Sequence, residues 1–148
     1  MTATNTSTSA LPADQPRRAR ILVADDSSEM RALLDELLSD EGYDVTVAAS
    51  GARALSIMND DPPDLLITDL LMPGMSGFAL RTLMLRRPDL AAVRVVVLSA
   101  YWHRPSETLD VAAVLEKPLN IDRLLETVRR LTDGTGTVDE RADGPDPS

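Results

Sequence analysis

The sequence predicts an α/β fold, a doubly wound sheet of five parallel strands with helices on both faces. Two observations lead to this prediction. Short apolar runs, rich in Val, Ile and Leu, alternate along the chain with segments whose apolar residues recur at the spacing of an α-helix. Serine or asparagine precedes several helical segments, and glycine or proline follows them. Strand and helix in alternation are typical of a parallel sheet connected by helices.

Five apolar runs have the length and composition of buried strands. All of them are far shorter than the roughly 20 apolar residues that a membrane-spanning helix needs. The predicted strands are RILVAD (20–25), DVTVA (44–48), DLLITD (64–69), RVVVLS (94–99) and AVLE (113–116).

The first two predicted helices lie between the first three strands. The first follows a cap at Ser27 or Ser28 and ends before Gly42. The second begins after Ser50 and stops before Pro62. Their apolar positions at helical spacing are Met30, Leu33, Leu34, Leu37, Leu38, Ala54, Leu55, Ile57 and Met58.

The third predicted helix runs from about residue 77 to residue 87 and stops at Pro88. Between the fourth and fifth strands only HRPSETLD (103–110) has a helical pattern. With Pro105 at its first position, the fourth helix is therefore predicted to be shortened to two turns at most. The last helix is capped by Asn120, and it is predicted to bury Ile121, Leu124, Leu125, Val128 and Leu131.

Composition restricts the class of protein. A chain of 148 residues suits one domain, and its net charge of −9 argues against a nucleic-acid groove and favours a soluble protein that takes up a cation. It has no cysteine, which excludes disulfides and thiolate metal sites. Residues 1–18 and 133–148 are polar and are predicted to be disordered tails around a folded unit at 19–132. Without a signal or membrane segment, we expect a cytoplasmic protein.

Polar residues stand at the carboxyl ends of four predicted strands, where an apolar strand would avoid them. Asp25 and Asp26 end the first strand, and Asp69 ends the third. Ser99 ends the fourth strand, and Lys117 follows the fifth. Because the carboxyl ends of parallel strands meet at one edge of a sheet, these groups are expected to converge where open α/β sheets bind ligands.

The types of these residues point to phosphoryl chemistry. Three carboxylates in one crevice repel each other, and a hard divalent cation such as Mg²⁺ relieves that repulsion at an oxygen-only site. Asp69 can be a nucleophile toward a phosphoryl group, giving an aspartyl phosphate. Ser99 offers a hydroxyl for the phosphoryl oxygens, and Lys117, the only lysine among 15 basic residues, offers a compact charge.

Four segments match a known family in order and at near-expected spacing. The stretches RILVADDSSEMR, DLLITDLLMPGMSGFAL, VVVLSAY and LEKPLNIDRLL resemble the receiver domain of two-component response regulators over about residues 19–132. The resemblance, which is to stand-alone chemotaxis-type regulators, implies a flavodoxin-like sheet in strand order 2-1-3-4-5. It also implies a phosphoryl donor, either a sensor histidine kinase or a histidine phosphotransfer protein. A downstream protein would be the partner, without direct nucleic-acid contact or membrane insertion.

The resemblance further implies a role for each matching residue. Asp69 would be the phosphoacceptor, and Ser99 and Lys117 would contact the phosphoryl oxygens. The Mg²⁺ site would comprise Asp25, acting mainly through water, Asp26, Asp69 and the main-chain carbonyl of Leu71. Such a domain is not a conventional enzyme, since it catalyses only its own phosphorylation and dephosphorylation.

Two features depart from the family pattern. Ser99 and Lys117 are 18 positions apart, fewer than usual by about one helical turn. Val114 stands where the family usually has a Tyr or Phe that rotates inward on activation. We therefore expect any signal to leave through another face of the domain.

Several functions stay open on the sequence. The leading expectation is a stand-alone switch acting through protein contacts, because no output domain follows Leu131. A shuttle or sink in a phosphorelay is the second. A pseudo-receiver used only as a scaffold is the third, and it is disfavoured because no active-site residue is missing. An aspartate-nucleophile phosphatase would have an Asp two positions after its nucleophile, where Leu71 stands.

Overall fold

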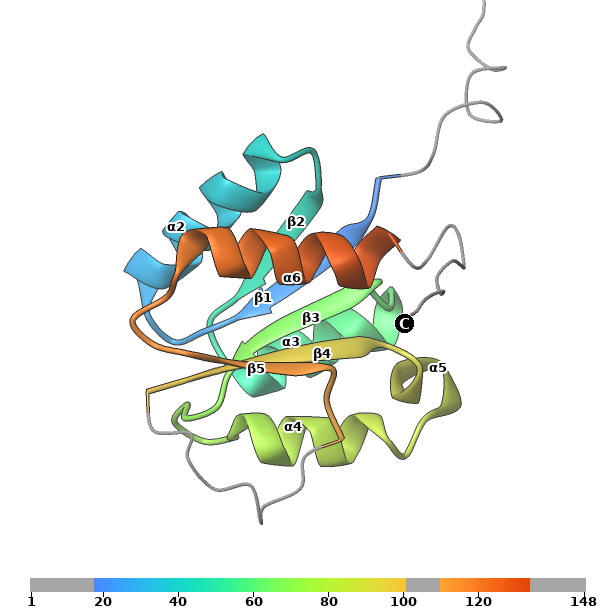
Figure 1. Ribbon diagram of the computed structural model, residues 1–148. Coiled ribbons are helices and arrows are strands. Elements are labelled where there is room, and N and C mark those ends of the chain that lie inside the picture. The colour runs from blue at the N-terminus through green and yellow to red at the C-terminus, as the bar shows by residue number, and fades with distance from the viewer. Residues whose placement is uncertain (1–17, 101–109, 134–148) are drawn as a thin grey trace, which may run out of the picture.

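The fold was obtained as a computed structural model, which describes residues 18–100 and 110–133 (Figure 1). The two predicted tails lie outside these residues, apart from residues 18 and 133. The predicted fourth helix also lies outside them, except for Asp110 at its end.

The sheet has five strands, all parallel, in the order β2-β1-β3-β4-β5. This confirms the predicted fold class and strand order. At the carboxyl edge, Ala24 of β1 is paired with Ala48 and Thr68, and Ser99 of β4 is paired with Glu116. The strands are β1 (Arg20–Ala24), β2 (Asp44–Ala48), β3 (Leu65–Asp69), β4 (Arg94–Ser99) and β5 (Ala113–Glu116).

Helices cover both faces of the sheet, as predicted (Figure 1). One face packs against α2 and α6 in a cluster that includes Leu34, Leu38, Leu124 and Val128. The other packs against α3 and α4 in a cluster that includes Met58 and Leu80. The described helices are α2 (Ser28–Asp40), α3 (Gly51–Asp60), α4 (Gly77–Met84), α5 (Pro88–Ala91) and α6 (Ile121–Asp133).

The predicted helix starts are confirmed by their caps. Ser27 Oγ accepts a hydrogen bond from Met30 N at 3.2 Å, and Asn120 Oδ1 accepts one from Arg123 N at 3.0 Å. Each contact satisfies an amide that the first helical turn leaves without a partner. Gly42, beyond the end of α2, has φ of 96°, a left-handed conformation that favours glycine.

The predicted third helix is wrong at its end. It was expected to continue to residue 87, but α4 ends at Met84 and a separate turn, α5, begins at Pro88. The residue before a proline avoids the helical region, and Arg87 is extended at φ −119° and ψ 127°. Pro88 then starts α5, because the first helical position needs no amide donor.

In α2 and α6, fewer residues are buried than the apolar patterns of these helices predict. In α2 only Leu34 and Leu38 are fully buried, whereas Leu33 is 40% exposed. In α6 the predicted positions Leu124 and Val128 are buried, and the other three are half-buried. None of the helices in the described ranges combines the length and apolarity that crossing a membrane requires.

Candidate functional site

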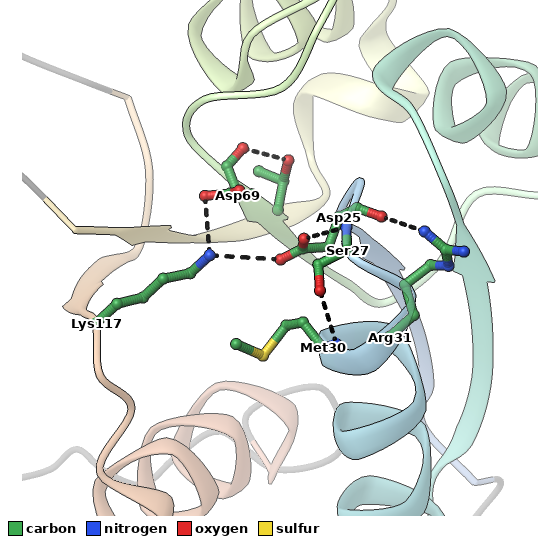
Figure 2. Close-up of polar contacts among 7 residues, drawn as sticks. Asp25, Ser27, Met30, Arg31, Asp69 and Lys117 are labelled. Atoms are coloured by element: carbon green, nitrogen blue, oxygen red, sulfur yellow. Dashed lines mark hydrogen bonds and ion pairs between the residues drawn. The ribbon is translucent and has the colours of Figure 1, made fainter.

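Three predicted acids meet at the carboxyl edge of the sheet, and Figure 2 shows two of them, Asp25 and Asp69. Asp25 follows β1, Asp26 begins the turn into α2, and Asp69 ends β3. One carboxylate oxygen from each lies within 4.8 Å of the other two. Since β1 and β3 are paired neighbours in the sheet, the strand order itself brings these carboxylates together.

Asp25 is held by contacts on three sides. Its amide donates to the carbonyl of Ala48 at 3.1 Å, and its Oδ1 accepts from Ser27 N at 2.9 Å. Its carbonyl accepts from Arg31 Nη1 at 2.8 Å. The remaining oxygen, Oδ2, is buried and has no hydrogen-bond partner among the described residues. Asp25 is therefore rigidly placed, with one oxygen left for an ion or ligand.

Asp69 lies at the start of a closely packed loop. The hydroxyl of Thr68 donates to the carbonyl of Asp69 at 3.0 Å, and Gly77 N donates to the carbonyl of Leu70 at 2.8 Å. A side-chain carbon added to Gly77 would lie 2.9 Å from the carbonyl oxygen of Asp69. A glycine is thus needed where α4 begins, because any larger residue would displace the backbone of the predicted phosphoacceptor.

Lys117 reaches this cluster from the end of β5. Its Nζ lies 3.4 Å from Asp69 Oδ1 and 3.7 Å from Asp25 Oδ2, and Figure 2 shows it extended toward both carboxylates. The amide of Lys117 donates to the carbonyl of Ser99 at 2.9 Å, and Ser99 itself is buried at the end of β4. The peptide between Lys117 and Pro118 is cis. Lys117 therefore lies at ion-pair distance from two of the carboxylates, and Ser99 ends β4, the strand next to β3.

The charge of Asp69 depends on several neighbours. Burial raises the pKa of its carboxyl above the ordinary value. The Lys117 cation opposes that rise, while the charges of Asp25 and Asp26 add to it. Lys117 therefore favours the ionised form, which is the form that can act as a nucleophile.

The donor set fits a hard divalent cation. All three side chains offer carboxylate oxygens, and Asp25 Oδ2 is a buried oxygen that lacks a hydrogen-bond donor. Oxygen ligands and a surplus of negative charge suit Mg²⁺, which keeps several of its waters when bound. Leu71 lies on the loop two residues after Asp69 and is 61% exposed. The role of its main-chain carbonyl stays a prediction.

Some residues at this site were not singled out from the sequence. Arg31 and Thr68 contact main-chain carbonyls of the strand-end acids, and Gly77 allows α4 to approach Asp69. A main-chain acceptor leaves no mark in the sequence. The only signal was position, since Thr68 and Gly77 lie within the quoted stretch around Asp69, and Arg31 is the last residue of the quoted stretch that contains Asp25.

Comparison with known proteins identifies the family. The family model for the response regulator receiver domain matches residues 21–129. The chain belongs to this family. Receiver domains are the phosphoaccepting parts of two-component systems, in which histidine kinases supply the phosphoryl group, and they typically bind Mg²⁺ at an acidic pocket. The chain is thus a receiver domain for phosphorylation-based signalling.

Similar proteins differ in how much of their own length this chain spans. Sporulation initiation phosphotransferase F of Bacillus subtilis is 32% identical over 117 residues, which cover 75% of this chain and 91% of that protein. Sensor histidine kinase TmoS of Ectopseudomonas mendocina is 42% identical over 106 residues, 72% of this chain but 10% of the kinase. The chain also spans only 28% of response regulator PleD of Caulobacter vibrioides, at 35% identity.

Solved structures agree with the family assignment. Chemotaxis protein CheY4 of Vibrio cholerae is 28% identical, with a TM-score of 0.72 over 78% of this chain and 99% of that one. The receiver domain of a signal transduction histidine kinase from Syntrophus aciditrophicus is also 28% identical. Its TM-score is 0.74 over 82% of this chain and 96% of that one.

Proposed function

We propose that this receiver domain is a switch in which Asp69 accepts a phosphoryl group, with Mg²⁺, from a sensor histidine kinase. The observation that supports it best is the convergence of the three carboxylates, with Lys117 Nζ 3.4 Å from Asp69 Oδ1. A structural role alone would not favour three acids facing a single cation, because their repulsion reduces the stability of the fold. Phosphorylation would then alter the affinity of the domain for a downstream protein.

The transfer requires one bond to form and one to break. A carboxylate oxygen of Asp69 bonds to phosphorus while the bond from phosphorus to the imidazole nitrogen of the donor breaks. That nitrogen keeps the electron pair of the broken bond. Ser99 donates its hydroxyl, and Lys117 its ammonium, to the phosphoryl oxygens. Lys117 already contacts Asp69, so it can follow the charge from the carboxylate to the phosphoryl group.

The cation site would be built from residues of β1 and β3. Asp26 and Asp69 would be direct ligands, Asp25 would act mainly through water, and the carbonyl of Leu71 would complete the set. When bound, Mg²⁺ supplies positive charge that offsets the carboxylates and the phosphoryl oxygens. The domain would have no other substrate, since it would catalyse only its own phosphorylation and dephosphorylation.

A phosphorelay shuttle is the second candidate. It is favoured by the similarity to sporulation initiation phosphotransferase F, of which the chain spans 91%. A shuttle would exchange its phosphoryl group rapidly with a histidine phosphotransfer protein, whereas a switch would keep it and bind a downstream protein. Measuring the rate of phosphoryl transfer from the phosphorylated chain to a histidine phosphotransfer protein therefore distinguishes the two functions.

The experiment that tests the proposal is the intact mass of the protein after incubation with acetyl phosphate and Mg²⁺. We expect one added phosphoryl group, which should be absent in EDTA and absent from Asp69→Asn. No addition to the wild type, when a known receiver domain is labelled in parallel, would contradict the proposal and favour a pseudo-receiver scaffold.

A further inference from the structure

Arg31 lies beside the acidic cluster without contacting any carboxylate in it. It is the fourth residue of α2, half-buried, and its Nη1 donates to the main-chain carbonyl of Asp25 at 2.8 Å. In Figure 2 Arg31 and Lys117 approach Asp25 from different sides. Arg31 thus links α2 to the end of β1, at the peptide that joins Asp25 to Asp26.

The contact with Arg31 is one of three hydrogen bonds that hold Asp25, apart from the ion pair with Lys117. The other two use backbone atoms, the carbonyl of Ala48 and the amide of Ser27. The three contacts leave Asp25 Oδ2 as the one side-chain oxygen of this residue that has no hydrogen bond. Among the three, only Arg31 acts through its side chain.

We propose that Arg31 is a positioning residue for Mg²⁺, which holds the Asp25–Asp26 peptide so that both carboxylates face the ion. The proposal rests on the Mg²⁺ dependence proposed above. A charge-assisted hydrogen bond to a carbonyl is stronger than a neutral one, and it restrains rotation of the peptide that follows. Without it, the carboxylates would have to be ordered at the expense of binding free energy.

A purely electrostatic role for Arg31 predicts the opposite effect. Arginine carries a positive charge, so it repels a divalent cation bound nearby. If charge were its only contribution, removing it would strengthen Mg²⁺ binding. If Arg31 positions the ligands, removing it weakens Mg²⁺ binding despite the loss of repulsion. The sign of the change therefore separates the two roles.

Calorimetric titration of the unphosphorylated protein with Mg²⁺ tests this inference. In Arg31→Met, which keeps an unbranched apolar stem and loses the donor, we expect Mg²⁺ to bind roughly tenfold more weakly. Arg31→Lys keeps a charged donor and should fall between Arg31→Met and the wild type. Arg53→Met is the matched control, because Arg53 is an exposed arginine in the first turn of α3. Its loss should leave the affinity unchanged or slightly higher.

Equal or tighter Mg²⁺ binding by Arg31→Met would overturn the inference while leaving the proposed function intact. Absence of Mg²⁺ binding by the wild type would overturn both. Circular dichroism of each variant shows whether the fold is kept. If Arg31→Met does not fold, Arg31→Lys serves as the test instead. Weaker Mg²⁺ binding than the wild type at unchanged charge supports positioning by Arg31, and equal binding overturns it.

Discussion

Charged side chains are paired at one edge of the sheet and in excess of their partners at the other. At the amino edge, charged side chains have partners: Arg20 pairs with Asp61 at 2.6 Å, and Arg94 Nη1 donates to the carbonyl of Leu131 at 2.6 Å. Arg81 is buried there and donates to three main-chain carbonyls, those of Ala91, Val93 and Asp110. These contacts join segments that are far apart in the chain, so the charges at this edge serve the structure.

At the carboxyl edge, negative charge is in excess. Asp25, Asp26 and Asp69 share one site, and within the described part of the chain Lys117 is the cation at ion-pair distance from its carboxylates. Burial raises the pKa of Asp69, which means that the fold opposes the ionisation on which its chemistry depends. In this fold, paired charges mark structural contacts, and surplus negative charge marks the functional site.

The largest expected effect is at the amino edge. Arg81→Met keeps much of the apolar stem but removes the donors to three carbonyls, so we expect the free energy of unfolding to fall by about 2–3 kcal/mol. Mg²⁺ affinity should stay unchanged. Urea unfolding followed by circular dichroism measures the free energy of unfolding, and calorimetric titration measures the Mg²⁺ affinity.

The control for this prediction is Arg86→Met, because Arg86 is exposed just after α4. Its effect on the free energy of unfolding should stay within about 0.5 kcal/mol. A changed Mg²⁺ affinity in Arg81→Met, at unchanged stability, would contradict the conclusion that the charges at the amino edge serve the structure alone.

A smaller effect of opposite sign is expected at the carboxyl edge. In the absence of metal, Asp69→Asn should increase the free energy of unfolding by about 1 kcal/mol, because the neutral amide avoids burying a charge among other acids. Asp61→Asn, which removes a partner of Arg20 at the amino edge, should not increase it. Urea unfolding in EDTA compares the two variants, and a loss of stability in Asp69→Asn would contradict the account.

The pH dependence of this stabilisation follows from the direction of the pKa shift. Below the ordinary pKa of Asp, both folded and unfolded wild type carry the proton, and the charge of Asp69 imposes no penalty. As pH rises toward the raised folded pKa, the unfolded chain loses its proton first, so the wild type loses stability relative to Asp69→Asn. The difference should then stay constant at higher pH. A difference that shrinks with rising pH would be contrary to this linkage.

Much of the fold could be predicted because its signals are local. The bounds of β2, β4 and β5 match their apolar runs, and β1 and β3 differ from theirs by one residue at an end. The strand order came from the resemblance to a family, since apolar runs do not say which strands are neighbours. The end of α4 was missed because Pro88 was interpreted as a stop, whereas it starts α5.

At the candidate site too, some residues could be predicted from the sequence and others could not. The acids and Lys117 could be predicted because polar residues at the ends of apolar strands are conspicuous. Arg31 and Arg81 could not, because an arginine within a helix is usually solvated, and their partners are main-chain carbonyls that any residue supplies. Their burial depends on tertiary packing, which the sequence pattern does not contain.

A Mg²⁺ titration followed by the backbone amide NMR signals tests directly whether the ion binds at the carboxyl edge of the sheet. We expect the amide signals of Asp25, Asp26 and the residues after Asp69 to shift together with one affinity, while those of Arg20 and Asp61 at the other edge do not shift. In Asp26→Asn these shifts should be lost or need much more Mg²⁺. Shifts centred on the amino edge, or no saturable shift at the carboxyl edge, would contradict the claim that surplus charge marks the functional site.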